Sequence, residues 1–372
     1  MLRSSRRAIS AAGCIVVVLL CGSALPAADD ATNKKFEQMI DKAVGFLGTK
    51  AQAADGSFNA QAGPAVTGLV ATGLLKHGRS PEDPVVAKAL KYLEGFVHED
   101  GGIYGEGNHK NYETCLALMT FKEANRGGKY DALIKKADAF IKATQWGGDG
   151  KTTAEAVQYG GAGYGRTGDR PDLSNTAFLV DALKAAGNEP NSEAMQRALV
   201  FVSRCQNLES PANTMPFAAK VNDGGFYYTP ALGGVSQAGV DEATGGLRSY
   251  GSMTYAGLKS MIYAGVKHDD PRVKAALGWL KKNYDLDNNP GMGTAGLFYY
   301  YQTMAKALSA VGEDRLVDAK GVSHDWRKEL IDELASRQRD DGSFVNDNAK
   351  WMEGDASLVS GYALLALAYA KK

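Results

Sequence analysis

Residues 325–370 read DWRKELIDELASRQRDDGSFVNDNAKWMEGDASLVSGYALLALAYA and contain two helical patterns separated by a turn. From Trp326 to Arg337, apolar residues recur at helical spacing and charged residues fill the opposite face, which predicts a half-exposed helix. The Asp-Asp-Gly at residues 340–342 supplies the chemistry of a turn. From Ser357 to Tyr369 the chain is apolar on nearly every side. Such a helix must be buried all round.

The half-exposed pattern recurs earlier in the chain as an alanine, two residues, an aromatic residue and an aliphatic residue. Five copies match, residues 326–337 are a looser sixth, and a glycine turn and a more apolar segment follow each copy. The copies begin at Ala43, Ala89, Ala137, Ala198 and Ala276. The apolar segments are residues 66–75, 114–121, 176–183, 253–263, 297–308 and 358–369. The turn glycines include Gly56, Gly101, Gly163, Gly224, Gly291 and Gly342. A repeat at this spacing indicates about six helical hairpins.

Helix pairs of this kind can form an open superhelix or a closed ring. An open superhelix would leave a polar face on both helices of each pair, whereas a ring buries one set of helices completely. The alternation of half-exposed and fully apolar helices therefore favours an all-α, (α/α)6 toroid over residues 28–372, with an inner and an outer ring. No alternating strand pattern of any length competes with it.

The start of the chain has the features of an export signal. Arg3, Arg6 and Arg7 precede a short apolar run and small residues, so residues 1–27 are predicted to be a signal peptide, either cleaved or kept as an anchor. We therefore expect an exported protein of the periplasm or cell envelope, with no transmembrane helix in the mature chain. Cys115 and Cys205, in units that should not touch, are expected to be free, buried thiols.

The charge balance excludes one class of partner. Lysine plus arginine and aspartate plus glutamate both number 42, and the charges are scattered along the chain. A nucleic-acid-binding protein would usually show a basic stripe, so we expect no nucleic acid as a partner.

The order aromatic-aliphatic, Gln, Asp-Gly-Ser/Gly-Phe resembles the QW-type repeat of squalene and oxidosqualene cyclases and of protein prenyltransferase β subunits. Residues 326–344 are the closest copy, and Gln206 with residues 223–226 is the next closest. The resemblance covers nearly the whole mature chain. It implies an α/α toroid around a cavity that takes isoprenoid or other apolar chains.

The catalytic motifs of these families are missing. The chain has no Asp-x-Asp-Asp-Thr, with which the cyclases protonate an alkene, and its nearest string, residues 285–289, reads Asp-Leu-Asp-Asn-Asn. The prenyltransferases hold zinc through an Asp-x-Cys pair and a distant His, but Glu113 and Ser203 stand two positions before Cys115 and Cys205. We therefore expect neither a metal nor a cofactor.

A closed ring brings the starts of its inner helices, with their free N–H groups, to one end of the cavity. Two insertions, residues 147–171 and 208–248, are long enough to reach over that end. The candidate cavity residues are Tyr112, Glu113, Asp172, Tyr228, Arg248, Tyr250, Tyr255, Tyr299, Tyr300 and Trp351. The candidate catalytic carboxylates are Asp241, Glu242, Glu353 and Asp355. Asp172 and Asp355 also suit the N-caps of helices.

Three functions remain open from these patterns. The leading interpretation is the binding of an apolar isoprenoid or lipid in the central cavity, with or without its transformation. The second is an enzyme with a non-standard carboxylate site, either a cyclase or a carbohydrate-active hydrolase or lyase that needs two carboxylates facing one cleft. The third is a non-catalytic scaffold whose lumen is filled by side chains.

Overall fold

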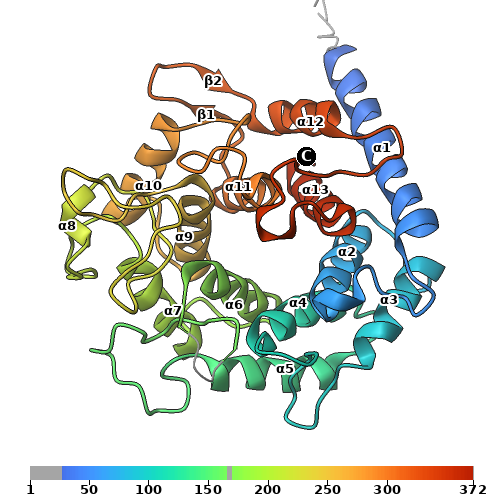
Figure 1. Cartoon of the computed structure of the whole chain (residues 1–372), viewed down its shortest axis with the longest axis horizontal. Coiled ribbons are helices and arrows are strands. Elements are labelled where there is room, and N and C mark those ends of the chain that lie inside the picture. The colour runs from blue at the N-terminus through green and yellow to red at the C-terminus, as the bar shows by residue number, and fades with distance from the viewer. Residues whose placement is uncertain (1–26, 166–169, 372) are drawn as a thin grey trace, which may run out of the picture.

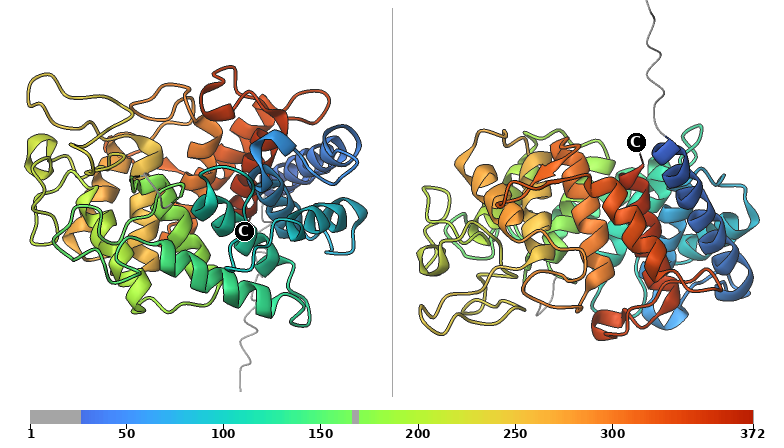
Figure 2. Two further views of the ribbon diagram at one scale, coloured as in Figure 1. Left: turned by 60° about the horizontal axis from the view of Figure 1, so that its bottom comes forward. Right: turned by 90° about the horizontal axis from the view of Figure 1, so that it is seen from above.

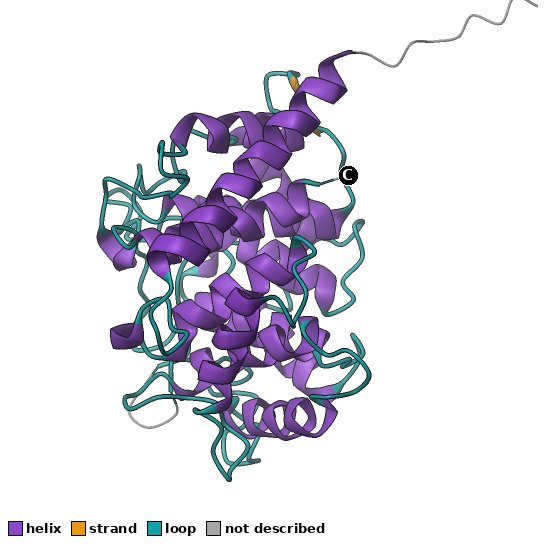
Figure 3. Cartoon of the chain, turned by 90° about the vertical axis from the view of Figure 1, so that its right-hand side faces the viewer, coloured by secondary structure: helices purple, strands orange, loops and turns teal. Residues whose placement is uncertain are grey.

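The structure, a computed structural model, describes residues 27–165 and 170–371. This part of the chain contains thirteen α-helices and one short antiparallel sheet, so most of it is helical (Figure 3). The prediction of a mostly helical chain is therefore confirmed. The predicted export signal, apart from Ala27, lies outside the described residues.

Six apolar helices form the inner ring (Figure 1). They are α2 (Pro64–Lys76), α4 (Lys110–Glu123), α6 (Leu173–Ala185), α9 (Gly251–Tyr263), α11 (Leu297–Val311) and α13 (Ala356–Ala370). Each inner helix packs against the next along the chain, and α13 packs against α2, which closes the ring. These helices cover the six apolar segments of the sequence, and closure explains why helices such as α2 and α13 have no polar face.

Six other helices lie outside this ring and cover it (Figure 1). They are α1 (Ala27–Phe46), α3 (Pro84–Glu94), α5 (Asp131–Thr144), α7 (Glu193–Arg204), α10 (Pro271–Lys282) and α12 (Trp326–Arg337). Three of them begin at an aspartate whose side chain accepts a backbone N–H bond: Asp83, Asp270 and Asp325. Outer and inner helices alternate along the chain, as in the predicted hairpins.

The remaining elements are short. They are the π-helix η1 (Leu47–Ala51), the 3₁₀ helices η2 (Ala60–Ala62) and η3 (Lys350–Met352), the helix α8 (Ala218–Val221), and the strands β1 (Leu316–Val317) and β2 (Ser323–His324). Cys115 and Cys205 are free and buried, as predicted. Within the described residues, no helix has both the length and the apolar character needed to cross a bilayer.

A repeated glutamine ties four of the six hairpins to the next one. Gln338 Nε2 donates to the carbonyl oxygen of Gly342 in its own turn, at 3.1 Å, and to that of Met39 on α1, at 2.8 Å. Three other glutamines make the same pair of bonds: Gln52 to Gly56 and Val85, Gln145 to Gly160 and Ala194, and Gln206 to Gly224 and Arg272. Gln338 therefore joins the last turn to the first helix and closes the ring.

The turn glycines lie directly against the next outer helix. At Gly342, where φ is 89°, an added Cβ would stand 2.2 Å from the carbonyl oxygen of Lys42, just before the repeat alanine Ala43. The same approach, to the carbonyl before the next repeat alanine, occurs at Gly56, Gly101, Gly160 and Gly224. In the third unit the glycine in this position is Gly160, not the predicted Gly163. Gly160 lies against Arg197 on α7, and its carbonyl accepts the bond from Gln145. This contact explains why glycine and alanine recur together.

The inner helices also pack closely against the turns. Within α9, a Cβ at Gly257 would stand 2.4 Å from the ring of Phe226, which is fully buried. Gly257→Ala is expected to lower the free energy of unfolding by about 1–3 kcal/mol, because the ring must move inside a packed core. Gly278 on α10 is the matched control, since nothing lies within 4 Å of its added Cβ. Gly278→Ala is expected to raise the free energy of unfolding by about 0.5–1 kcal/mol. Urea denaturation measures both, and an unchanged Gly257→Ala would contradict the packing.

Candidate functional site

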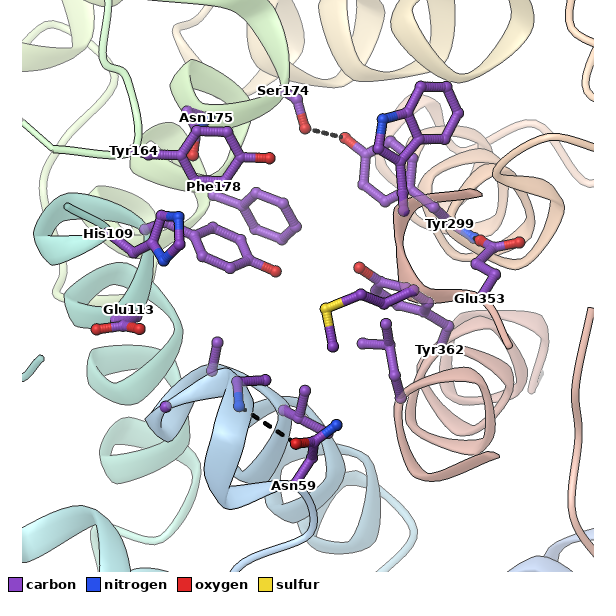
Figure 4. Close-up of a pocket in the computed structure, with 18 of the residues that line it drawn as sticks. Asn59, His109, Glu113, Tyr164, Ser174, Asn175, Phe178, Tyr299, Glu353 and Tyr362 are labelled. Carbon is purple, nitrogen blue, oxygen red and sulfur yellow. Dashed lines mark hydrogen bonds between the residues drawn. The ribbon is translucent and has the colours of Figure 1, made fainter. Parts of the chain in front are cut away.

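A cavity of about 700 Å³ opens at the end of the ring where the inner helices begin (Figure 4). Residues from the first turns of all six inner helices line it. Both long insertions reach its mouth, since Tyr164 comes from the first and Tyr228 and Gln237 come from the second. Figure 2 shows the loops before α9 and α13 gathered at this end, with the C terminus at the opposite end. The inner-helix starts therefore meet as the sequence predicts.

Aromatic side chains form most of the wall. They are Tyr112, Tyr164, Phe178, Tyr228, Tyr250, Tyr299, Trp351 and Tyr362. Five of these rings form a continuous chain, with centroids 5.6 Å apart from Tyr164 to Tyr112, 5.3 Å from Tyr112 to Phe178, 6.2 Å from Phe178 to Tyr299 and 6.0 Å from Tyr299 to Tyr362. Burial raises the pKa of Tyr112, Tyr299 and Tyr362, so these side chains remain neutral phenols. The wall is therefore apolar and uncharged over much of its surface.

Most of the predicted cavity residues lie in this wall. Tyr112, Glu113, Tyr228, Tyr250, Tyr299 and Trp351 all line the cavity, and so does Glu353 from the carboxylate candidates. They come from the ends of different hairpins, which only ring closure brings together.

The other predicted cavity residues lie elsewhere. Asp172 caps α6, where its Oδ1 accepts the Asn175 N–H at 2.8 Å. Tyr255 and Tyr300 pack against each other between α9 and α11, with ring centroids 5.7 Å apart, and the Tyr300 hydroxyl donates to the Asp285 carbonyl. Arg248 is exposed on its loop. The structure thus gives Asp172, Tyr255 and Tyr300 packing and capping roles.

Three of the four candidate catalytic carboxylates are outside the cavity lining. Asp241 and Glu242 lie on the second insertion, and Asp241 accepts the N–H and hydroxyl of Thr244, which lower its pKa. Asp355 caps α13, because its Oδ1 accepts the Leu358 N–H at 2.7 Å, and its Oδ2 accepts the Asn59 amide at 2.9 Å. These groups stabilise a loop and a helix start.

Glu353 lines the cavity, but both of its oxygens are already engaged. Oε1 accepts the Tyr299 N–H at 2.8 Å, and Oε2 accepts the Phe298 N–H at 3.2 Å and the Asn346 amide at 2.6 Å. The residue before α11 is a glycine, Gly296, with no side chain to cap the helix. Glu353 supplies that cap from a distant part of the chain. Burial raises its pKa, and these bonds oppose the rise.

Glu113 is a different kind of carboxyl group. It is only 5% exposed, and its Oε2 accepts the Gly105 N–H at 2.9 Å. Its Oε1 lies beside Gly63, where an added Cβ would be 2.6 Å away. Burial raises the pKa of Glu113, and the Gly105 bond opposes this only in part. Glu113 thus presents a carboxyl group with a raised pKa to the cavity.

Two residues at the lip of the cavity have strained backbones. Trp351 and Met352 have φ values of 56° and 65°, although neither is glycine, and they are 45% and 47% exposed. The Trp351 ring packs over Gly296, where an added Cβ would be 3.0 Å from it. Strain of this kind costs about 1–3 kcal/mol per residue and clusters at binding sites. Its position here supports the cavity as the functional site.

A charged cluster lies beyond the floor of the cavity. Phe178 and Tyr299 line both the cavity and a small chamber that contains Asp181 on α6, Lys259 on α9 and Lys306 on α11. Each ammonium group lies 2.6 Å from one Asp181 oxygen, and the Lys259 ammonium also donates to the Ala177 carbonyl at 3.2 Å. The cluster joins three inner helices.

Several lining residues were not predicted, including His109, Tyr164, Phe178, Asn59 and Tyr362. Phe178 and Tyr362 belong to helices that are apolar all round, so the sequence contains no pattern that separates their lumen face from their packing face. Tyr164 and Asn59 lie in loops. Among the residues that the structure describes, no group of three or more His, Cys, Asp or Glu side chains could hold a metal ion.

Residues 58–229 match the family described as the squalene-hopene cyclase C-terminal domain. The resemblance expected from the repeat is confirmed. A variant of the type II terpene cyclase MstE from Scytonema, in complex with its substrate geranylgeranyl dihydroxybenzoate, superposes with a TM-score of 0.56 at 15% identity, over 92% of this chain and 99% of that chain. No curated protein matches the chain by sequence.

Two further MstE structures are similar to this chain to about the same degree. A variant in complex with the product merosterolic acid A gives a TM-score of 0.57 at 15% identity, over 92% of this chain and 98% of that chain. The apo enzyme gives 0.54 at 16% identity, over 90% of this chain and 97% of that chain. At these identities the likeness shows the fold, a terpene cyclase α/α toroid.

Proposed function

We propose that residues 28–372 form an (α/α)6 toroid protein that binds an isoprenoid or a similar apolar molecule in its central cavity. The observation that carries the proposal is the cavity of about 700 Å³ with its aromatic wall. Sites for small molecules are typically about 300–1,000 Å³ and mainly apolar, with a few polar groups. The ligand named for MstE, geranylgeranyl dihydroxybenzoate, supports an isoprenoid as the ligand class.

Two of the three carboxyl groups that line the cavity, Glu113 and Glu353, are buried, and they favour binding over acid-initiated cyclisation; the third, Glu106, is exposed. Protonation of an alkene needs a carboxylic acid that neighbouring groups have made unusually strong. Burial raises the pKa of both Glu113 and Glu353, so each holds its proton more tightly than a carboxyl group in water. Their environments therefore act in the direction opposite to the one that this chemistry requires.

The same two residues are poorly arranged for glycan hydrolysis. That reaction needs one carboxyl group as an acid and a second as a base or nucleophile. Glu113 and Glu353 lie on opposite walls (Figure 4), and both Glu353 oxygens accept bonds from the start of α11. A scaffold with a filled lumen also fits poorly, because the lumen is open.

The binding proposal predicts that the purified chain carries or takes up an apolar ligand. Solvent extraction followed by mass spectrometry is expected to yield an isoprenoid or lipid, and the emptied protein is expected to bind geranylgeraniol. Ala65→Phe, which adds a ring at the cavity wall, is expected to weaken that binding by about tenfold or more, equivalent to about 1.4 kcal/mol. An extract with no such molecule, together with no uptake of geranylgeraniol, would refute the proposal.

We also propose that the protein is exported to the periplasm or cell envelope. The support is the order of charges, apolar run and small residues in residues 1–27. Fractionation of cells that make the full chain is expected to recover it outside the cytoplasm. Recovery in the cytoplasm with residues 1–27 intact would contradict this.

A further inference from the structure

Glu113 is a buried acid without a charged partner in the described part of the chain. It lies in the first turn of α4, between the loop that leads into α2 and the Gly105 loop. Burial and the Gly105 N–H are the influences on its pKa, and no cation contributes. Lys110, one turn away, holds its ammonium 4.4 Å from the centre of the Tyr104 ring. A buried carboxylate without a cation is unfavourable, so this site stabilises the neutral acid relative to the carboxylate.

The two oxygens of Glu113 have different surroundings. Oε2 accepts the Gly105 N–H at 2.9 Å, so it is the carbonyl-like oxygen of the neutral acid. Oε1 receives no hydrogen bond from any residue that the structure describes, and it lies over Gly63, where a larger residue would collide with it. The acid proton therefore belongs on Oε1. A neutral carboxylic acid with its proton there is a hydrogen-bond donor without an acceptor of its own.

The side chains around Glu113 make other contacts, so the Glu113 donor faces the cavity. His109 on the same helix packs against Tyr164, with ring centroids 5.2 Å apart, and Tyr112 packs against Phe178. Tyr92 on α3 also lies near Glu113, and burial first, then the nearby carboxyl groups of Asp55 and Glu113, raise the pKa of its hydroxyl. Figure 4 shows Glu113 and His109 together on one wall, facing the cavity that separates them from Glu353 and Tyr362. A ligand atom in the cavity is the available acceptor.

We propose that Glu113 donates a hydrogen bond to a neutral oxygen atom of the ligand, so that the cavity selects an isoprenoid with an acceptor oxygen, such as a ketone, ester or ether, over the corresponding hydrocarbon. This inference rests on the proposed binding function. When the hydrocarbon binds, the Glu113 donor is buried without an acceptor, and burying a polar group without a partner is unfavourable. The rest of the wall binds both molecules through apolar contact.

The proposal has a pH signature. The pKa of Glu113 is raised, so the acid keeps its proton to a higher pH than a free glutamate does. As pH rises through this raised pKa, the donor is lost and a buried anion faces the ligand oxygen. Affinity for the oxygenated ligand should therefore fall with rising pH, whereas affinity for the hydrocarbon should change much less.

The test uses the full chain and two probes, geranylgeranyl methyl ether, whose oxygen accepts a hydrogen bond but cannot donate one, and the hydrocarbon with the same skeleton but no oxygen. Their dissociation constants are measured for the wild type, Glu113→Leu and Glu113→Gln. The wild type is expected to prefer the ether by about tenfold, the value of one hydrogen bond of about 1.4 kcal/mol. Glu113→Leu should lose this preference and still bind the hydrocarbon. Glu113→Gln keeps an N–H donor, so it should retain the preference without the pH dependence.

Two other outcomes separate the inference from the proposed function. If the wild type binds both probes equally, or if Glu113→Leu weakens both equally, the inference is wrong while the binding function stands. If neither probe binds the wild type, the binding function itself fails. Should Glu113→Leu not fold, the pH dependence of the wild type against Glu113→Gln decides the matter, because an unchanged pH profile overturns the inference.

Discussion

Replacement of Asp181 by alanine is expected to lower the free energy of unfolding by about 3–5 kcal/mol. Asp181 is the shared partner of Lys259 and Lys306, with 2.6 Å between each ammonium and a carboxylate oxygen. Its side chain and that of Lys259 are both only 4% exposed. Removing the carboxylate leaves two ammonium groups facing each other in the centre of the ring without a counter-charge. Breaking a buried ion pair in this way is among the most destabilising single changes.

Lys259→Met gives the matched comparison. It leaves Asp181 paired with Lys306 alone, one negative and one positive charge, and replaces a buried ammonium by an apolar chain of similar length. We therefore expect a much smaller loss of stability than in Asp181→Ala. As a surface control, Glu37→Ala breaks the pair with Lys371, in which both side chains are 61% exposed, and this pair is expected to contribute only about 0–1 kcal/mol. Equal losses in Asp181→Ala and Lys259→Met would contradict the charge argument.

The same cluster predicts a pH dependence. Burial lowers the pKa of Lys259 below the unfolded value, so between the two pKa values the unfolded chain binds more protons than the folded one. Stability should therefore rise with pH through this alkaline window, and Lys259→Met should abolish that rise. At the acid end, burial raises the pKa of Asp181, but the two lysines outweigh burial and hold this pKa below the unfolded value. The stabilisation from Asp181 is therefore complete above the unfolded pKa and is lost as pH falls from there through the lowered value. Unfolding in urea at several pH values measures both effects.

The sequence contains a pattern that points to the Asp181 ion-pair cluster, although the repeat obscured it. Lys259 is the only charged residue of α9, and Lys306 is the only one of α11. A lone charge on a helix that must be buried all round needs a partner on a neighbouring buried helix. The pattern could therefore have predicted a pairing between inner helices. It could not have predicted Asp181 as the shared partner, because that depends on how far each helix is rotated.

Rotation of the inner helices also limited prediction of the site. Tyr299, Tyr300 and Tyr301 follow one another on α11, and only Tyr299 lines the cavity. Tyr300 and Tyr301 point into the packing and donate their hydroxyls to the carbonyls of Asp285 and Leu286. The helix is apolar on all sides, so no hydrophobic periodicity separates these three positions. The fold was predictable because its signal is a repeat over the whole chain, whereas the cavity wall depends on single residues.

The two candidate acids before α13 illustrate the same limit. Asp355 has the position of an N-cap and is one, so local spacing was sufficient. Glu353, two residues earlier, caps α11 instead, a helix that begins more than fifty residues before it. Local sequence carries no trace of that contact. Capping between residues this far apart in the sequence depends on ring closure, which brings the loop before α13 to the start of α11.

A large backbone effect is expected at Gly342, in the stretch that closes the ring. Its φ of 89° is unfavourable for any residue with a Cβ, and the added atom would stand 2.2 Å from the carbonyl oxygen of Lys42. Gly342→Ala is expected to lower the free energy of unfolding by about 2–5 kcal/mol, from about 1–2 for the backbone conformation and about 1–3 for moving the packed backbone of α1. The bond from Gln338 to Met39 crosses the same contact and should weaken with it.

Gly321 separates these two contributions. It has a φ of 84°, close to that of Gly342, but nothing lies within 4 Å of its added Cβ. Gly321→Ala should therefore lose only the conformational part, about 1–2 kcal/mol. Urea denaturation gives the difference between the variants, and hydrogen exchange in α1 locates it, because only Gly342→Ala should release the Met39 region. Equal losses would mean that the contact between the last turn and the first helix adds nothing. A larger loss in Gly342→Ala would mean that the ring is held closed at the seam between its two ends.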